Sequence, residues 1–239
     1  MVILGIDTST EYAGVCLYDH GVLHEVTWRS GRNHTVQLAD RLARMLREGG
    51  IAVSDLTGIA VAIGPGSFSG VRVGVAMAKS MALALDVPLA GIPTLDAIAH
   101  QHAWFCGAIR PVIDGGRGQI ATALYTGGNW SATARGEPAL ADLVALLPVT
   151  EPTLFCGEVY PELHALITRS GGELARSIGP AAHARRAGFL AELAEARFRR
   201  GDTDDPLTLQ PVYLRRPAIL DRTPGADATA PIRSNPCPT

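Results

Sequence analysis

The stretch that decides the fold is residues 58–85, which read GIAVAIGPGSFSGVRVGVAMAKSMALAL. Its first part is an apolar run typical of a buried strand, and Val71–Leu85 predicts a helix. Between them lies a turn in which Gly64, Gly66 and Gly70 allow another backbone to approach closely. A strand, a glycine-rich turn and a helix in this order favour an α/β fold.

The glycine-rich turn is also a candidate anion site. The helix that follows it begins with free N–H groups, which attract phosphates and carboxylates. A phosphate or nucleotide loop would consist of Asp7, Thr8, Gly64, Gly66, Ser67 and Gly70. The turn is not a Walker A loop, because Val71 and Arg72 stand where that motif requires Lys and Ser or Thr. A tight structural connection is the alternative interpretation.

The helix predicted over Val71–Leu85 is apolar on nearly every side. One row of small residues contains Gly70, Gly74, Ala78 and Ala82, and an apolar row beside it contains Val73, Met77 and Met81. A helix of this kind must be covered on both sides. One cover is the sheet of its own domain, and the other is either a neighbouring helix or a second protein chain.

Strands and helices alternate along the rest of the chain. Strands are expected at Val2–Asp7, Tyr12–Tyr18, Val22–Trp28, Leu56–Ile63, Pro88–Ile92, Ile109–Ile113, Gln119–Tyr125 and Thr153–Cys156. Helices are expected at Thr35–Glu48, Thr94–His102 with Thr94 as N-cap, Pro138–Leu147, Pro161–Arg169 and Ala181–Arg200. In the last helix we expect Phe189, Leu193 and Ala196 on one side. For the basic residues we expect a solvated face, with contact to a phosphate backbone as the alternative; they are Arg185, Arg186, Arg197, Arg199 and Arg200. We therefore expect two α/β halves, residues 1–103 and 104–220, followed by a disordered tail over 221–239.

Composition excludes several classes of protein. The 239 residues are 47% hydrophobic with a formal charge of −2, so a core is possible and no segment is basic enough to bind nucleic acid on charge alone. The four cysteines are far apart, which indicates a reduced cytoplasmic protein. The apolar run around Val73–Leu85 is shorter than a membrane span, so no membrane role is expected.

No catalytic residue and no metal ligand is expected. His20 and His24 are four apart on a predicted hairpin, where they would lie about 13 Å apart along the strand. No serine has the Gly-x-Ser-x-Gly surroundings of a nucleophile elbow. A peptidase activity therefore has no residues to support it.

Several motifs, in this order and spacing, closely resemble the bacterial TsaB (YeaZ) family. They are ILGIDTST at residues 3–10, His34 four residues before Leu38, GPGSFSGVRVG at residues 64–74, Ala78-Lys79 and Tyr213-Leu214-Arg215. The resemblance is dense over residues 1–100 and thin afterwards. It implies an actin-like ATPase (ASKHA) fold with two ribonuclease-H-like α/β halves and mixed sheets.

The resemblance also implies a function. TsaB-like proteins take part in forming N6-threonylcarbamoyladenosine (t6A) at position 37 of tRNAs that read codons beginning with A. In that system the TsaD-like subunit is catalytic, a TsaE-like ATPase assists, and ATP and a metal act on these partners rather than on TsaB. Contact with tRNA is then indirect, and a homodimer is possible when the chain is alone. The alternative is an actin-like ATPase or kinase acting through Asp7 and the Gly64–Gly70 loop.

The sequence differs from the related families at two places. Thr94 and Ile98 stand where TsaD-like proteins carry two metal-binding histidines, so the resemblance implies no metal at this site. TsaB-like proteins often carry Asp-Ala-Arg-x-x-Glu-Val-Tyr in the second half, but this chain has DGGRGQIA at residues 114–121. A role of that region toward the ATPase or tRNA is therefore not implied here.

The resemblance finally implies a partner surface. The first two helices of TsaB-like proteins pack against the same helices of TsaD, or of a second TsaB, as a four-helix bundle. In this chain they are the helices predicted over Thr35–Glu48 and Val71–Leu85. The candidate interface residues are Leu38, Leu42, Met45, Arg72, Gly74, Met77, Ala78 and Met81.

Overall fold

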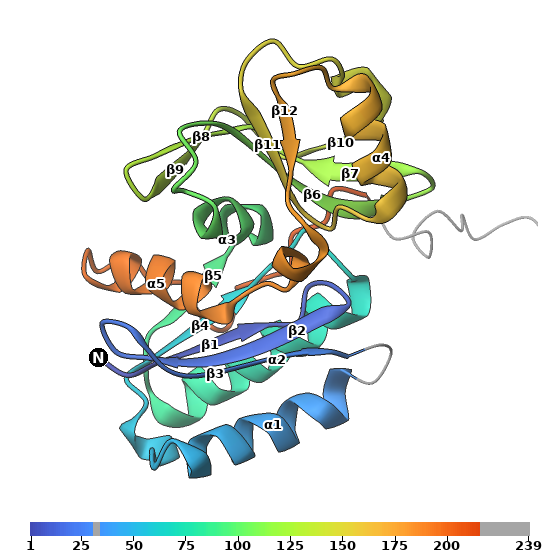
Figure 1. Cartoon of the computed structure of the whole chain (residues 1–239). Helices are drawn as coiled ribbons and strands as arrows, with labels where there is room; N and C mark the ends of the chain where they lie inside the picture. Colours follow the sequence, from blue (N-terminus) through green and yellow to red (C-terminus); the bar gives the residue numbers. More distant parts are fainter. Residues whose placement is uncertain (31–33, 216–239) are drawn as a thin grey trace, which may run out of the picture.

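The computed structural model describes residues 1–30 and 34–215, without the side chains of residues 34–36. The tail predicted over 221–239 lies outside the described residues. The chain forms two α/β halves, each built on its own sheet (Figure 1).

The sheet of the first half has five strands in the order β3-β2-β1-β4-β5. They are β1 Ile3–Asp7, β2 Tyr12–Tyr18, β3 Val22–Arg29, β4 Gly58–Ala62 and β5 Leu89–Ile92. β1, β2 and β3 are antiparallel neighbours, whereas β1, β4 and β5 run parallel. The predicted hairpin is confirmed as β2 and β3. The two later predicted strands are also confirmed, as β4, which pairs with β1, and β5, which pairs with β4.

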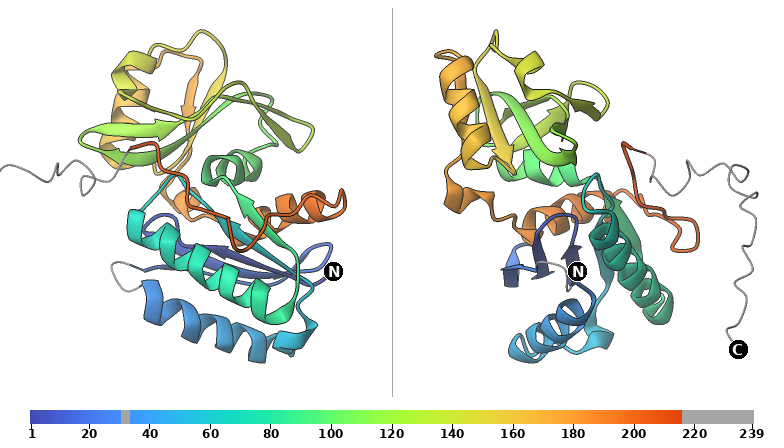
Figure 2. Two further views of the ribbon diagram at one scale, coloured as in Figure 1. Left: turned by 180° about the vertical axis from the view of Figure 1, so that it is seen from behind. Right: turned by 90° about the vertical axis from the view of Figure 1, so that its right-hand side faces the viewer.

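Helices cover both faces of this sheet. α1 (His34–Glu48) and α2 (Phe68–Leu85) lie on one face, and α5 (Ala187–Phe198) lies on the other (Figures 1 and 2). The alternation of side chains along β1 explains this, because Leu4 and Ile6 join the core under α1 and α2 while Ile3 joins the core under α5. The strand is buried on both sides, which is why it reads as a continuous apolar run.

The second half contains a mixed sheet of seven strands. Its main order is β10-β7-β6-β11-β12, with β8 paired to β6 and β9 paired to β8. The strands are β6 Gly107–Gly116, β7 Gln119–Thr122, β8 Tyr125–Gly128, β9 Ser131–Ala134, β10 Ala139–Ala141, β11 Thr153–Gly157 and β12 Ala175–Ser177. α4 (Pro161–Ser170) packs on this sheet, and α3 (Thr94–Gln101) connects the halves (Figure 1). The remaining short elements are 3-10 turns at Val53–Asp55, Leu143–Leu146 and Pro180–His183.

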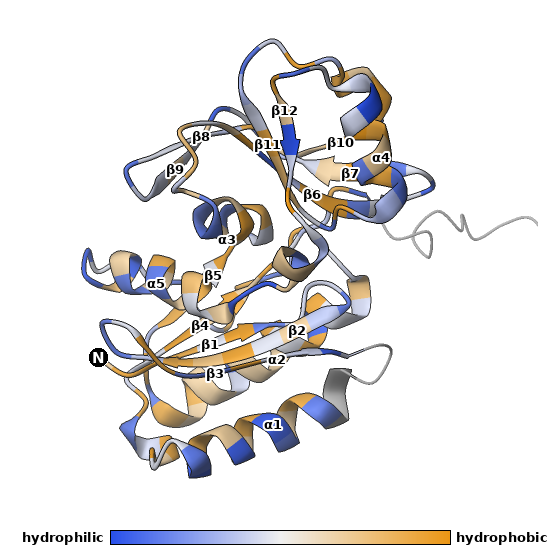
Figure 3. Ribbon diagram, viewed as in Figure 1, coloured by the Kyte–Doolittle hydropathy of each residue, from blue (hydrophilic) through white to orange (hydrophobic). Residues whose placement is uncertain are grey.

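Hydropathy follows these layers. The strands of both sheets are mostly apolar, while the outward side of α1 is polar (Figure 3). In α1, Leu38, Leu42, Met45 and Leu46 are buried, which confirms the predicted amphipathic helix.

Two predicted helices of the second half differ from the structure. The helix predicted over Pro138–Leu147 is instead strand β10 and a 3-10 turn, because Ala139–Ala141 pairs with β7 and Asp142 caps Val144 N. The helix predicted over Ala181–Arg200 is shortened to α5, whose buried residues include Leu190, Ala191 and Ala194. Leu193 of the predicted side is half-buried against this core, whereas Ala196 is exposed. Tertiary pairing and packing override local propensity in both cases.

Thr94 does not cap its helix in the way expected. Pro93 occupies the N-cap position of α3. The Thr94 hydroxyl instead accepts a hydrogen bond from Gly64 N at 3.1 Å, and Thr94 N donates to Gly64 O at 2.8 Å. This residue therefore fixes the beginning of the glycine-rich loop.

After α5 the chain returns to the first half as an extended segment, residues 203–215, which we call the strap. Asp204 pairs with Leu89 at the edge of the first sheet, and its carboxylate accepts a hydrogen bond from Gly91 N at 2.7 Å. The strap then runs along α2 (Figure 2, left). It ends where Arg215 Nη2 donates to Gln119 Oε1 in the second half, at 2.5 Å.

Candidate functional site

The Gly64–Gly70 loop packs directly on the turn that follows β1. A Cβ added to Gly66 would lie 2.0 Å from Ser9 O, and one added to Gly70 would lie 2.1 Å from Thr8 O. Ser67 N donates to Ser9 O at 2.6 Å, and the Thr8 hydroxyl donates to Gly70 O at 2.7 Å. The glycines are therefore required for contact between two turns of the same protein.

The Asp7 carboxylate is engaged inside the chain. Asp7 Oδ1 accepts hydrogen bonds from Ser9 N at 2.9 Å, Ser9 Oγ at 2.6 Å and Arg185 Nη2 at 3.0 Å. The side chains of Arg185 and Asp7 are only 7% and 6% exposed. Arg185 was expected on a solvated face, and this expectation is wrong because the connection before α5 delivers it to the end of β1.

Three of the other four arginines near α5 are also paired. Arg186 contacts Glu25, Arg197 contacts Asp202 and Asp204, and Arg199 contacts Glu195. These ion pairs compensate the positive charge that the sequence concentrates in this segment.

The residues of the predicted phosphate loop are engaged within the chain. Gly66, Ser67 and Gly70 pack on the turn at Thr8 and Ser9, Asp7 pairs with Arg185, and Gly64 contacts Val212 and Thr94. A neighbouring cleft of about 340 Å³ separates the loop from the second half and is lined by Thr10, Glu11, Gly66, Ser67, Ile113, Asp114, Glu158 and Tyr160. Its three carboxylates would repel phosphate groups. The geometry thus favours the structural interpretation of the loop.

The sequence predicts no metal site at Thr94 and Ile98. Both side chains are buried, with Thr94 bound to Gly64 and Ile98 in the core of the second half. Within residues 1–30 and 34–215, no group of three or more His, Cys, Asp and Glu is arranged to hold a metal ion. Nearby His102 is buried, and burial lowers its pKa to about 4.

Five of the eight candidate interface residues lie inside the chain. Leu38, Leu42 and Met45 of α1 and Gly74 and Ala78 of α2 are buried in the core of the first half. A Cβ on Gly74 would lie 2.4 Å from Thr8 Oγ1, so this glycine lets α2 approach β1. The small-residue row thus faces the sheet, and these five residues are corrected from surface to core.

The opposite side of α2 faces outward. Its exposed residues include Phe68, Arg72, Ala76 and Leu83, while Met77 and Met81 are half-buried. Three of these, Phe68, Ala76 and Leu83, were not among the candidates from sequence. The signal was present, because Phe68, Arg72 and Ala76 are each offset by two positions from the small-residue row, which is about 200° around a helix.

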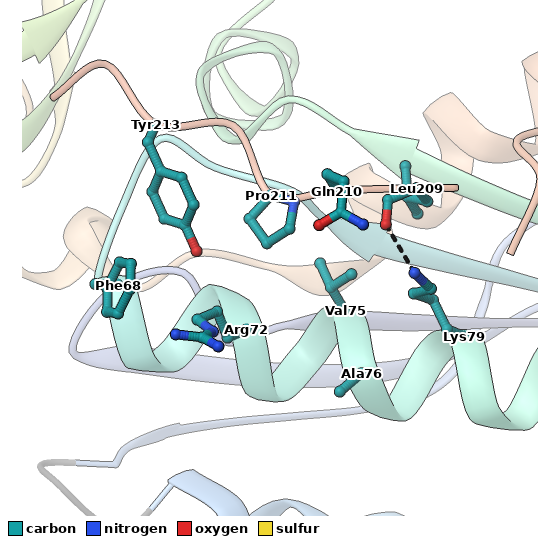
Figure 4. Close-up of a pocket in the computed structure, with 9 residues that line it drawn as sticks. All are labelled: Phe68, Arg72, Val75, Ala76, Lys79, Leu209, Gln210, Pro211 and Tyr213. Carbon is teal, nitrogen blue, oxygen red and sulfur yellow. Dashed lines mark hydrogen bonds between the residues drawn. The ribbon is translucent and has the colours of Figure 1, made fainter. Parts of the chain in front are cut away.

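A groove of about 380 Å³ separates α2 from the strap (Figure 4). Phe68 and Tyr213 pack with ring centroids 5.1 Å apart, and the Arg72 guanidinium lies 5.0 Å from the centre of the Phe68 ring. Lys79 Nζ donates to Leu209 O at 2.9 Å and to Leu207 O at 3.3 Å. The helix and the strap together therefore form one surface.

α2 is long and apolar enough to cross a membrane by length and composition alone. It has 18 residues and exceeds the predicted apolar run 73–85, because it begins at Phe68 behind the N-cap Ser67. Six of its residues are buried, chiefly against β1 and β4. This is the position of a core helix in a globular α/β protein.

The sequence of the chain is similar to those of known proteins. Residues 21–153 match the family model for TsaD, tRNA N6-adenosine threonylcarbamoyltransferase. The chain is 30% identical over 245 residues to the tRNA threonylcarbamoyladenosine biosynthesis protein TsaB of Escherichia coli, covering 95% of this chain and 100% of that protein. It is 39% identical over 126 residues to the TsaB of Bacillus subtilis, but this match spans only about half of each chain, 52% here and 55% there.

Two solved structures from Pseudomonas aeruginosa share the fold. One is described as an uncharacterized protein with similarity to peptidase YEAZ, with a TM-score of 0.77 and 23% identity over 90% of this chain and 99% of that chain. The other is YeaZ, with a TM-score of 0.72 and 23% identity over 89% of this chain and 100% of that chain. The fold and its two sheets define an actin-like α/β protein. Within that class, the chain belongs to the TsaB (YeaZ) family.

Proposed function

We propose that this chain is a non-catalytic cytoplasmic subunit that binds a TsaD-like threonylcarbamoyltransferase and activates it. The product is t6A at position 37 of tRNAs that read codons beginning with A. Relatives of the chain are named as t6A biosynthesis proteins, which supports a role in this pathway. The observation that carries the proposal is the exposed apolar face of α2. In addition, the candidate nucleotide loop packs against other residues of the same chain.

The outer face of α2 has the composition of a protein interface. Phe68 is 40% exposed and Leu83 is 53% exposed, with Ala76 between them and Met77 and Met81 at the side. Aromatic residues, Met and Arg are enriched in interfaces, and adjacent exposed apolar side chains mark sites of association. When the enzyme is absent, we expect the same face to pair with a second copy of the chain.

Catalysis by the chain itself is disfavoured by the geometry at β1. An ATPase or kinase would use Asp7 to reach a metal and phosphates, but this carboxylate is paired with Arg185. The N–H of Ser67 in the glycine loop is likewise bound to Ser9 O. We therefore propose that the chain holds no cofactor of its own, that ATP and the metal act on the TsaD-like and TsaE-like partners, and that tRNA is contacted indirectly.

The test is size-exclusion chromatography with light scattering on this chain, the TsaD-like enzyme of the same organism, and their mixture. We expect a 1:1 complex that Ala76→Arg abolishes, because a charge would enter the centre of an apolar contact. Ala165→Arg is the matched control, since Ala165 is an exposed helical alanine on α4 in the other half. A folded Ala76→Arg variant that still binds would contradict the assigned surface, and no complex with wild-type chain would contradict the function.

Activation is tested in the same system. Purified enzyme should form t6A on tRNA only slowly alone and faster with the wild-type chain. The Ala76→Arg variant should fail to accelerate it, whereas the Ala165→Arg variant should act as wild type. Turnover of ATP by the isolated chain would instead support the kinase or ATPase alternative.

A further inference from the structure

The groove between α2 and the strap carries two cations and no carboxylate. The residues that line it are Phe68, Arg72, Val75, Ala76, Lys79, Leu209, Gln210, Pro211 and Tyr213. In the described part of the chain, Arg72 forms no ion pair and no side-chain hydrogen bond, and its guanidinium stacks on Phe68. Its guanidinium has five N–H donors, and all remain available to a ligand.

Lys79 also has capacity left. Its ammonium group has three donors and uses two of them on the carbonyl oxygens of Leu207 and Leu209. These two bonds hold the ammonium at the edge of the strap rather than free in solvent. Neither Lys79 nor Arg72 meets a carboxylate in residues 1–30 or 34–215, so the groove has an uncompensated charge of about +2.

The position of Arg72 is determined by its neighbours. Its guanidinium lies over the Phe68 ring, and the Phe68 ring packs on Tyr213 of the strap (Figure 4). An arginine that is stacked on an aromatic ring loses less conformational freedom when it forms a bidentate contact. The same arrangement presents a planar donor group at the mouth of the groove.

The two cations of the groove lie on the same side of α2. Arg72 and Lys79 are seven residues apart on α2, so they lie on one side of the helix about 10 Å apart along its axis. Val75 and Ala76 lie between them and provide an apolar floor. A ligand that matches this groove has an apolar middle and two negative charges about two helical turns apart.

We propose that this groove is the docking site for an acidic segment of the partner enzyme, with one carboxylate bound to Arg72 and a second near Lys79. The proposal rests on the proposed function and names the chemistry by which α2 recognises its partner. Carboxylate side chains match the guanidinium fork in two parallel hydrogen bonds. Charge complementarity of this kind selects the partner and orients it.

A polyanion such as RNA fits the same groove less well. Binding along a phosphate backbone requires a row of cations, and this groove offers two, separated by an apolar floor. The whole chain has a formal charge of −2, which opposes association with RNA. The acidic protein segment is therefore the occupant that the charges and the apolar floor favour together.

The experiment measures the affinity of the full chain for the TsaD-like enzyme by isothermal titration calorimetry, at about 50 mM and about 300 mM NaCl. We expect Arg72→Gln to weaken binding by at least about tenfold at low salt, and the difference to shrink at high salt. Arg169→Gln is the matched control, because Arg169 is an exposed arginine on α4 in the other half. Arg72→Lys should fall between wild type and Arg72→Gln, since it keeps the charge and loses the fork.

A charge-repair series makes the result specific. Arg72→Glu should abolish binding, and converting one acidic residue of the enzyme to Lys should restore it. Melting temperatures equal to wild type show that the variants are folded. The contact between α2 and the strap is probed separately with Lys79→Gln, which should reduce binding less than Arg72→Gln does.

The outcomes distinguish the groove proposal from the proposed function. If the wild-type chain binds and Arg72→Gln binds equally well at low salt, the groove proposal is overturned while the proposed function stands. If the folded wild-type chain does not bind the enzyme, both are overturned. If the isolated chain binds tRNA and Arg72→Gln removes that binding, the groove is an RNA site and the proposal is overturned.

Discussion

The Arg185 guanidinium donates a hydrogen bond to the Asp7 carboxylate at 3.0 Å, with both side chains more than nine-tenths buried. The two residues are 178 positions apart, so this contact joins the end of β1 to the connection before α5. The two buried charges therefore compensate each other, through Nη2 of the guanidinium.

Removing Arg185 should leave an uncompensated buried charge. We expect Arg185→Met to lower the free energy of unfolding by about 3–5 kcal/mol, as measured by urea denaturation. The double variant Asp7→Asn with Arg185→Met should recover most of this loss, because neither charge remains. The control is Arg169→Met on the exposed surface of α4, which should change stability by less than about 0.5 kcal/mol. Equal stability of Arg185→Met and wild type would show that the ion pair contributes nothing.

The hairpin between β8 and β9 contains a tryptophan in an unfavourable conformation. Asn129 and Trp130 both have positive φ, 52° and 60°, and Trp130 is 77% exposed. Two positive φ values in a two-residue hairpin turn favour Asn-Gly, because glycine adopts this region without steric cost. We expect Trp130→Gly to raise the free energy of unfolding by about 0.5–1 kcal/mol in urea denaturation.

A matched variant separates conformation from side-chain loss. Trp130→Ala removes the same indole but keeps a Cβ at positive φ, so it should gain less than Trp130→Gly. Equal stability of Trp130→Gly and Trp130→Ala would contradict the conformational argument, and lower stability of both variants than wild type would show that the indole makes a stabilising contact.

Burial of His102 should make stability depend on pH. The pKa of His102 is lowered from 6.5 to about 4 because burial disfavours the imidazolium form. The unfolded chain therefore binds a proton at higher pH than the folded chain does, so stability is present above pH 6.5 and falls as the pH drops toward 4. The contribution lost over this window is about 3 kcal/mol at most, from the size of the pKa change.

The measurement compares urea unfolding of wild type and His102→Leu between about pH 7 and about pH 4. The difference in stability should shift in favour of His102→Leu as the pH falls. His100→Leu is the control. His100 lies on α3, two residues before His102, and its Nε2 is 3.2 Å from the exposed carboxylate of Glu192. Parallel pH profiles for wild type and His102→Leu would show that folding does not lower the pKa of His102.

The first half was largely predictable because its sequence is locally consistent. The alternation in Tyr12–Tyr18, the turn residues at 19–21 and the strand before Gly64 each agree with the final fold. Local pattern and tertiary packing favour the same structure there. All the TsaB-like motifs except Tyr213-Leu214-Arg215 lie in this part.

The site was less predictable for two physical reasons. Helical periodicity shows that α2 has two apolar sides, but only the position of Thr8 under Gly74 shows which side faces the sheet. The partner of Asp7 is Arg185, and no local pattern relates residues so far apart. The strap was also missed as a part of the surface, because its segment has little secondary structure of its own.

The contact between Gly74 and Thr8 gives a prediction that separates the core side of α2 from its outer side. Gly74→Ala adds a Cβ 2.4 Å from Thr8 Oγ1, so either the hydroxyl or the helix must move. We expect a loss of about 1–3 kcal/mol, although alanine favours a helix over glycine by about 1 kcal/mol. In a Thr8→Ala background the obstructing oxygen is absent, and the same Gly74→Ala change should be neutral or stabilising.

The double-mutant cycle in urea denaturation measures this coupling directly. The control is Ala76→Gly, on the outer face of α2, which should cost about 1 kcal/mol both in the wild-type background and in the Thr8→Ala background. Association with the enzyme should survive in every folded member of the cycle, because Gly74 faces the sheet and not the partner. Additive effects of Thr8→Ala and Gly74→Ala would mean that the two residues do not restrict each other. Loss of enzyme binding in a stable Gly74→Ala variant would mean that the small-residue row faces the partner after all.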